Sequence, residues 1–112
     1  MVVMDAGTGK VIAHFPIGKG VDFAAFDPDS KLVFTSSGEG SLGIFLQKSA
    51  DEYEDAGAVK TQQSAKTLAF DSVTKKVFLP AADFDVVPPA EAGGRPKRAM
   101  KPGSFVVLVV GK

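Results

Sequence analysis

The segment GTGK, Gly7 to Lys10, contains residue types that phosphate-binding loops use. Such loops follow the pattern G-x-x-x-x-G-K-[ST] between a strand and a helix, so that backbone amides and a helix N-terminus face the phosphate. Here the first glycine is misplaced, Val11 follows the lysine, and the next residues have the composition of a strand. We therefore expect a hairpin turn and no phosphate site.

His14 is the only histidine of the chain. A metal site would need further His, Asp or Glu side chains at ligand spacing, and a catalytic triad would need a placed nucleophile and acid. If residues 10–15 form a strand, His14 lies on the face opposite Ala13 and Phe15. We interpret His14 as a packing or interface residue rather than a catalytic one.

Aspartates open two turn-like segments, Asp27 in DPDSK and Asp71 in DSVTK. Aspartate side chains in turns accept hydrogen bonds from nearby backbone N–H groups, and Pro28 supplies the φ angle that a turn needs. A calcium loop would require several oxygen ligands in one stretch, as in D-x-[DN]-x-[DN]-G, and neither segment fits that pattern. Both aspartates are expected to cap turns.

An acidic segment, ADEYEDAG at residues 50–57, contains Asp51, Glu52, Glu54 and Asp55. Charges beside an outer strand usually form a solvated rim that discourages edge-to-edge pairing. We interpret the segment in this way, with a cation site as the alternative.

A basic segment, RPKRAMK, lies within a proline-rich insertion. Five of the seven prolines fall between Pro80 and Gly103, which predicts an extended loop over residues 80–103 with little helix or strand. No aromatic stacking platform is interleaved with the cations, so we expect no nucleic-acid partner. We expect the loop to lie across a neighbouring subunit, with four partner-contact residues, Arg95, Lys97, Arg98 and Lys101.

The overall composition suits a packed protein and indicates no cofactor. Of the 112 residues, 45% are hydrophobic and 23% charged, and the net charge is zero, which favours neither nucleic acid nor an anionic membrane. The absence of cysteine excludes disulfides and thiolate chemistry, and the longest apolar run is too short to span a bilayer. The N-terminus lacks the features of a signal peptide, which predicts a cytoplasmic location for the chain as written.

An internal repeat predicts the elements that would position these residues. AAFDPDSKLVFTSS, residues 24–37, returns as LAFDSVTKKVFLPA, residues 68–81, so that Phe26 and Phe70 are equivalent at a spacing of 44 positions. A weaker match relates GSLGIF at 40–45 to GSFVVLVV at 103–110. A period in the forties made of short strands is typical of propeller blades, each of which is a four-stranded sheet.

Valine and phenylalanine concentrate in short segments that are separated by Gly, Pro, Asp and Ser, and no segment keeps a 3.6-residue apolar period. We therefore expect an all-β chain. The predicted strands are Val2–Asp5, Lys10–Phe15, Val21–Phe26, Lys31–Ser36, Leu42–Gln47, Tyr53–Thr61, Lys66–Phe70, Lys75–Leu79 and Ser104–Val110.

Nine strands correspond to about two and a half blades. Residues 1–17 would supply the third and fourth strands of a preceding blade, residues 18–62 a complete blade, and residues 63–112 a blade that lacks its outer strand. A lone arc would leave edges and apolar faces uncovered. We expect a partial β-propeller of antiparallel blades that closes as a homo-oligomer, a trimer or tetramer with a dimer as the alternative, residues 10–15 of one chain completing the last blade of another.

The run VVMDAGTGKVIAHFPIGKGVDFAAFDPDSKLVFTSSGEGSLGIF, residues 2–45, resembles the YncE-like β-propeller repeat of surface-antigen and quinoprotein-dehydrogenase-like propellers. PGSFVVLVVGK, residues 102–112, is similar to the C-terminal end of bacterial members. The resemblance implies a WD40-like propeller fold. Full-length relatives are longer and usually periplasmic or secreted, so it also implies that this chain corresponds to a C-terminal part of such a protein.

Propeller ligands bind at the mouth of a central channel, which the loops after the second and fourth strands of each blade surround. On our strand assignment, five residues occupy this region, namely Lys19, Asp22, Ser37, Glu39 and Lys66. Asp22 and Lys66 are equivalent in the repeat, so acid and base would alternate around a ring, either to hold a small polar ligand or to pair charges between blades.

Our leading hypothesis is a non-enzymatic, self-associating propeller that acts as a scaffold or binding module. The competing hypothesis is a subunit of a quinoprotein-like propeller enzyme, or a binder of an unidentified small polar ligand, acting at the channel mouth. The lone histidine and the lack of nucleophile–base spacing favour the first. A third hypothesis is an adaptor that binds an acidic partner through RPKRAMK.

Overall fold

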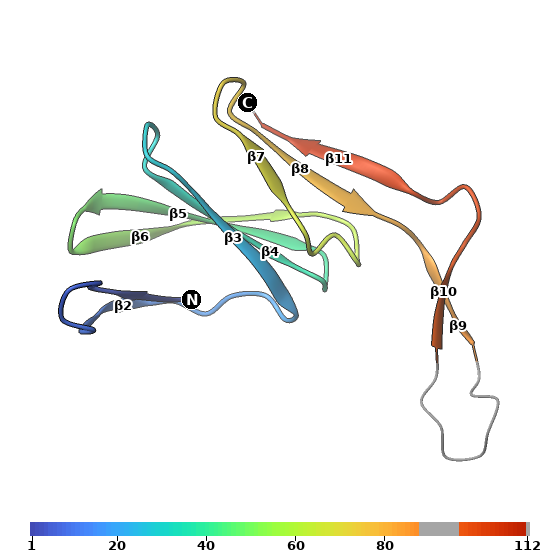
Figure 1. Cartoon of the computed structure of the whole chain (residues 1–112), viewed down its shortest axis with the longest axis horizontal. Coiled ribbons are helices and arrows are strands. Elements are labelled where there is room, and N and C mark those ends of the chain that lie inside the picture. Colours follow the sequence, from blue (N-terminus) through green and yellow to red (C-terminus); the bar gives the residue numbers. More distant parts are fainter. Residues whose placement is uncertain (88–96, 112) are drawn as a thin grey trace, which may run out of the picture.

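The structure, a computed structural model, describes residues 1–87 and 97–111. These residues form eleven β-strands and, within that part of the chain, no helix. All pairings between the strands are antiparallel. The expectation of an all-β, antiparallel chain is therefore confirmed, and Figure 1 shows the strands gathered into separate sheets and hairpins.

The largest sheet has four strands in sequence order. They are β3 (Val21–Asp27), β4 (Leu32–Ser37), β5 (Ser41–Ser49) and β6 (Glu52–Lys60). We call this sheet the first sheet. Each connection is a short turn, and the β4–β5 turn needs Gly40, whose φ of 108° is one that side chains rarely adopt.

The second sheet has three strands in the order β11, β8, β7, with bounds Val106–Val110, Lys76–Ala81 and Ala69–Asp71. Strand β7 begins three residues later than we predicted. The preceding segment is bonded to the first sheet instead, since the Ser64 N–H donates to the Gly38 carbonyl at 2.8 Å and the Ser36 hydroxyl donates to the Lys66 carbonyl.

Strands β1 (Val2–Met4) and β2 (Val11–His14) form a separate hairpin around GTGK. The Asp5 carboxylate accepts the N–H groups of Gly7 and Thr8 at 2.8 and 2.9 Å. The predicted hairpin turn is therefore confirmed.

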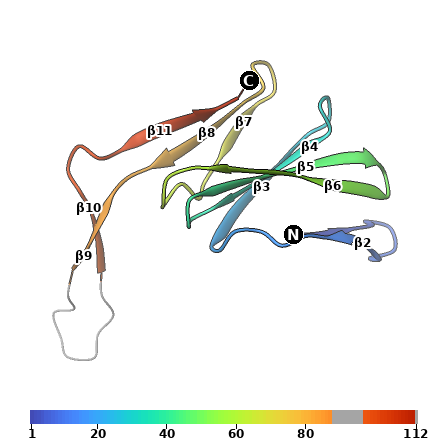
Figure 2. The same ribbon diagram turned by 180° about the vertical axis from the view of Figure 1, so that it is seen from behind.

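The prediction of an extended loop at 80–103 is wrong in part. Strands β9 (Phe84–Val87) and β10 (Lys97–Met100) pair there as an antiparallel hairpin that projects from the second sheet (Figures 1 and 2). None of the prolines lies within these two strands, so the ladder keeps its backbone donors. The high proline content of the whole segment predicted a loop, although two short stretches within it contain no proline and form strands.

The sequence repeat is reproduced in the turns β3–β4 and β7–β8. The Lys31 N–H donates to the Asp27 carbonyl, and the Lys75 N–H donates to the Asp71 carbonyl, both at 2.8 Å. The two lysines have positive φ angles of 62° and 60°. Each aspartate side chain accepts the N–H two residues ahead, at 3.2 and 2.9 Å, so the expected turn caps are confirmed.

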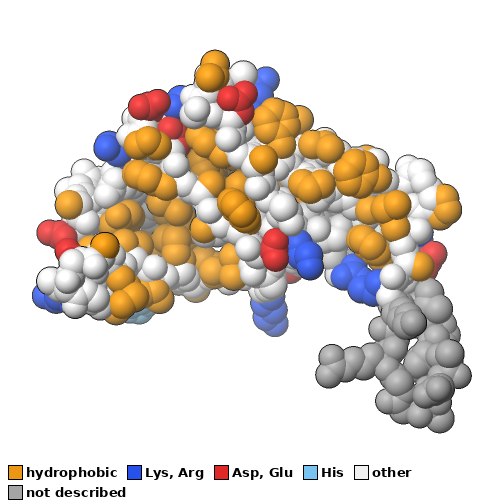
Figure 3. Space-filling view, in the orientation of Figure 1, with side chains coloured by type: hydrophobic (Ala, Val, Ile, Leu, Met, Phe, Trp, Pro, Cys, Tyr) orange, Lys and Arg blue, Asp and Glu red, His pale blue; other side chains and the backbone are white. Residues whose placement is uncertain are grey.

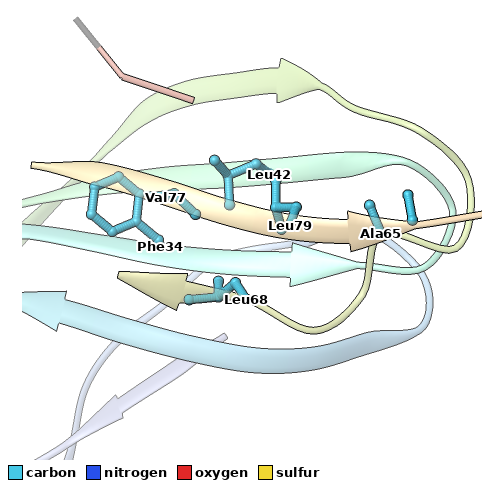
Figure 4. Close-up of a cluster of buried hydrophobic side chains, with 7 residues drawn as sticks. Phe34, Leu42, Ala65, Leu68, Val77 and Leu79 are labelled. Carbon is cyan, nitrogen blue, oxygen red and sulfur yellow. The ribbon is translucent and has the colours of Figure 1, made fainter. Parts of the chain in front are cut away.

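The core lies between the first and second sheets, which pack face to face. Figure 4 shows Phe34 and Leu42 of the first sheet opposite Val77 and Leu79 of the second, with Ala65 and Leu68 from the connecting segment. These side chains are all buried, and fully burying one side chain as large as Leu79 contributes about 1.5–3 kcal/mol. This interface is the main hydrophobic contact of the described residues.

The opposite faces of these sheets are only partly covered. Phe15, after β2, packs on Phe45 of the first sheet with ring centroids 5.2 Å apart, but Phe26 remains 46% exposed. On the second sheet, Val107 and Val109 are 51% and 55% exposed, and Figure 3 shows hydrophobic side chains over β8 and β11. The radius of gyration is 16.9 Å, against about 13 Å for a compact domain of 100 residues.

We predict that Leu79→Ala lowers the free energy of unfolding by about 2–5 kcal/mol, because it opens a cavity in the only large inter-sheet contact among the described residues. Urea denaturation followed by circular dichroism measures the change. The control is Val73→Ala, at a position 87% exposed in a turn, where a change within about 0.5 kcal/mol is expected. Equal effects of the two substitutions would contradict this core.

Candidate binding groove and inter-sheet contacts

A groove of about 740 Å³ lies between the β9–β10 hairpin and the end of the first sheet that contains Val21 and Gly38. We call it the hairpin groove. It contains two of the residues that the sequence placed at a channel mouth and one that it placed at a partner contact. The side chains that line it include Asp22, Lys66, Phe84, Arg98, Met100 and Phe105.

The acid and one cation of the groove come from equivalent positions of the repeat. Asp22 lies at a β-bulge near the start of β3, and its Oδ2 atom accepts the Thr67 hydroxyl at 3.1 Å. Lys66 is exposed beside it, with its backbone held by the Ser36 hydroxyl. The structure describes both Asp22 and Lys66, and they form no salt bridge with one another. The predicted pairing of these charges between blades is therefore not observed.

The apolar wall of the groove comes from the hairpin and the residues after it. The Arg98 guanidinium lies 4.6 Å from the centroid of the Phe84 ring, a cation–π contact across the β9–β10 pair. Met100 and Phe105 are 51% and 60% exposed along the same groove. The groove thus combines two cations, Lys66 and Arg98, and the acid Asp22 with an apolar wall.

Three residues predicted at the channel mouth lie outside this groove. Lys19 is exposed, and its carbonyl accepts the Glu39 N–H at 3.3 Å. Glu39 accepts the Ser41 hydroxyl at 3.4 Å and faces a second hollow, of about 380 Å³, on the side of β5 and β6. Ser37 is 1% exposed, and its hydroxyl has no hydrogen-bond partner among the described residues.

The four cations that the sequence analysis assigned to a partner contact do not lie together in one described site. Arg95 lies outside the described residues, and Lys97 lies in β10 opposite Val87. Lys101 forms a salt bridge with Asp85 at 3.4 Å, within the hairpin itself. Of the predicted partner-contact residues whose side chains the structure describes, Arg98 lines the hairpin groove and Lys101 does not.

A lysine bridge that the sequence analysis missed joins the two sheets at their outer turns. Lys75 Nζ lies 3.0 Å from Asp27 Oδ1 and 2.9 Å from Asp29 Oδ2. The Asp27 side chain is 1% exposed. Hydrogen bonding from the Ser30 hydroxyl, together with Lys75 and the Asp29 N–H, outweighs desolvation and lowers the pKa of Asp27 to about 2.

The other polar segments form no assembled site in the part of the chain that the structure describes. His14 is exposed on β2. The acidic residues lie along β6 and its turn, where Glu54 pairs with Lys48 at 2.6 Å. Within residues 1–87 and 97–111, no group of three or more His, Asp or Glu side chains could hold a metal ion. No helix long and apolar enough to cross a bilayer occurs in that part of the chain.

Comparison of the chain with protein-family models, with curated proteins and with solved structures finds no match.

The lowered pKa of Asp27 predicts a pH dependence of stability. Because its folded-state pKa of about 2 lies below the unfolded value of about 3.9, its contribution is complete above about pH 5 and is lost as the pH falls towards 2. Asp27→Asn should make the decrease in unfolding free energy between pH 5 and about pH 2 smaller than in the wild type. Urea titrations at several pH values measure this.

The control for this experiment is Asp51→Asn, which removes an exposed carboxylate from a turn. It should leave the wild-type pH dependence unchanged. The bridge would have no role in acid sensitivity if Asp27→Asn and the wild type lost stability in parallel.

Proposed function

We propose that this chain is a non-enzymatic, self-associating partial β-propeller that acts as a scaffold or binding module. One observation carries the proposal: two antiparallel sheets repeat the same strand order and turn geometry, and each has an apolar face on the side away from the other. In a propeller, such sheets pack face to face around an axis, and no blade face remains open.

The open face of the second sheet is apolar along its length. Val107 lies opposite Pro80, and Val109 lies opposite Phe78, so these four side chains share the face away from the core. The first sheet presents Phe26 on its own outer face. A head-to-tail contact between copies would bring these faces together and repeat the packing that already joins the two sheets within one chain.

The edges of the sheets support the same arrangement. Strand β6 bears Glu52, Glu54 and Asp55, as expected of an edge protected from pairing. Strand β11 is also an edge strand, yet its sequence is VVLVV and carries no charge. Strand β2 has an unpaired edge in its two-stranded sheet, so in this proposal β2 of one copy adds to β11 of another.

Light scattering of the purified chain tests the proposal. We expect a mass of three or four times the chain mass of 11.7 kDa, with a dimer at lower concentration. Val109→Lys should shift the protein to the mass of one chain while its circular dichroism spectrum is unchanged, because a charge in the buried contact lacks a partner.

The matched control is Ala50→Lys, which places the same charge in the exposed β5–β6 turn, outside the proposed contact, and should leave the mass unchanged. A wild-type mass of one chain at every accessible concentration would refute self-association.

A second candidate function, binding of a small ligand, is favoured by the two cations and the apolar wall of the hairpin groove. The ligand class that this surface fits is a small organic anion with a hydrophobic body. By contrast, no hydrogen bond between His14 and a carboxylate occurs among the described residues, so no acid–base pair supports the enzymatic alternative.

Titration with benzoate, followed by nuclear magnetic resonance, tests the groove. Lys66→Gln and Arg98→Gln should each weaken binding by about tenfold, since each removes one charge-assisted contact. Lys60→Gln, which removes an exposed cation on β6, should not change the affinity. Equal affinities for all four proteins would assign binding to another surface.

A further inference from the structure

The turn that carries the inter-sheet lysine occurs twice in the chain. Lys75 belongs to the β7–β8 turn and reaches back to Asp27 of the β3–β4 turn at 3.0 Å. The repeat makes Lys31 equivalent to Lys75, and Asp71 equivalent to Asp27, each at a spacing of 44 positions. The lysines share the left-handed backbone conformation, so their side chains leave equivalent turns from equivalent positions.

Among the described residues, one member of each equivalent pair has no ionic partner. Lys31 is exposed, and no carboxylate of the described residues lies within salt-bridge distance of its ammonium group. Asp71 accepts the Val73 N–H and the Thr74 hydroxyl, and no lysine or arginine of the described residues reaches it. The chain therefore presents a cation at the turn of the first sheet and an anion at the turn of the second.

The β3–β4 turn shows that an aspartate that caps its turn can also bind a lysine of the next sheet. Asp27 accepts a backbone N–H and the Ser30 hydroxyl, as Asp71 accepts the Val73 N–H and the Thr74 hydroxyl. Asp27 nevertheless also binds Lys75, because a carboxylate offers about four acceptor sites. Asp71 has the same remaining capacity.

We infer that Lys31 of one copy binds Asp71 of a second copy, and that this ion pair sets the register of the head-to-tail contact. The inference rests on the proposed self-association. The order of the two sheets in this contact follows from the bridge within one chain, where Lys75 of the second sheet binds Asp27 of the first sheet. The first sheet of the copy that supplies Lys31 takes the place after the second sheet of the copy that supplies Asp71. Phe26 of the former then approaches Val107 and Val109 of the latter.

The contact between copies differs from the one within the chain at one position. Lys75 bridges Asp27 and Asp29, but the position equivalent to Asp29 is Val73. The lysine between copies would therefore bind one carboxylate rather than two. Val73→Asp restores the second carboxylate, so it should lower the dissociation constant of the assembly by up to about fivefold.

Reversal of the two charges tests the pair. Sedimentation velocity over a concentration series should show that Lys31→Glu and Asp71→Lys each raise the dissociation constant of the assembly by about tenfold or more, because like charges then meet. An equimolar mixture of the two variants should recover assembly, since each contact between unlike chains pairs opposite charges. The recovery should be complete in a tetramer, where the two chains alternate, and partial in a trimer, which keeps one contact between like chains. Lys60→Glu is the matched control and should assemble as the wild type does.

Asp71→Lys also removes a turn cap, so its fold is checked by circular dichroism. Lys31→Glu and Val73→Asp leave both turn caps in place, so their effects on the dissociation constant are sufficient to test the Lys31–Asp71 ion pair. Wild-type association of Lys31→Glu, together with no gain for Val73→Asp, would overturn the ion pair while self-association remained. A wild-type protein that stays monomeric would overturn both the pair and the proposed function.

Discussion

The packing of one antiparallel sheet on another is the interaction on which the rest of this structure depends. Phe34 and Leu42 meet Val77 and Leu79 across that interface, and Lys75 joins the two sheets at its outer rim. A sheet has two faces, however, and within the described residues each of these sheets is fully covered on one face only. The uncovered faces and the uncharged edge of β11 lead to the proposal that further copies extend the stack.

Most strands could be predicted because their signals are local. The repeat pairs Asp27 with Asp71 and Lys31 with Lys75, and side-chain caps with a left-handed lysine then define the same turn twice. The β9–β10 hairpin could not be predicted in this way. Its stability comes from pairing across an intervening segment and from Arg98 over Phe84, a contact that neither short strand signals alone.

The candidate groove was predicted only in part. The repeat brings Asp22 and Lys66 to one end of the sheets, as expected. Glu39 lies within the tight β4–β5 turn, which the Gly40 N–H closes on the Ser37 carbonyl, and it faces the hollow beside β5 and β6. Arg98 reaches the groove through the register of the hairpin, and the Lys75–Asp27 bridge joins residues 48 positions apart. Such contacts follow from tertiary packing, which no short sequence pattern encodes.

Hydrogen exchange of the β11 backbone tests the central claim most directly, because a strand at the end of a sheet leaves its outward N–H groups open to water. If copies add to this edge, the outward amides of Val106–Val110 should exchange slowly in concentrated protein and quickly after dilution. Rapid exchange of these amides at every concentration, with the core strand β8 still protected, would contradict the account.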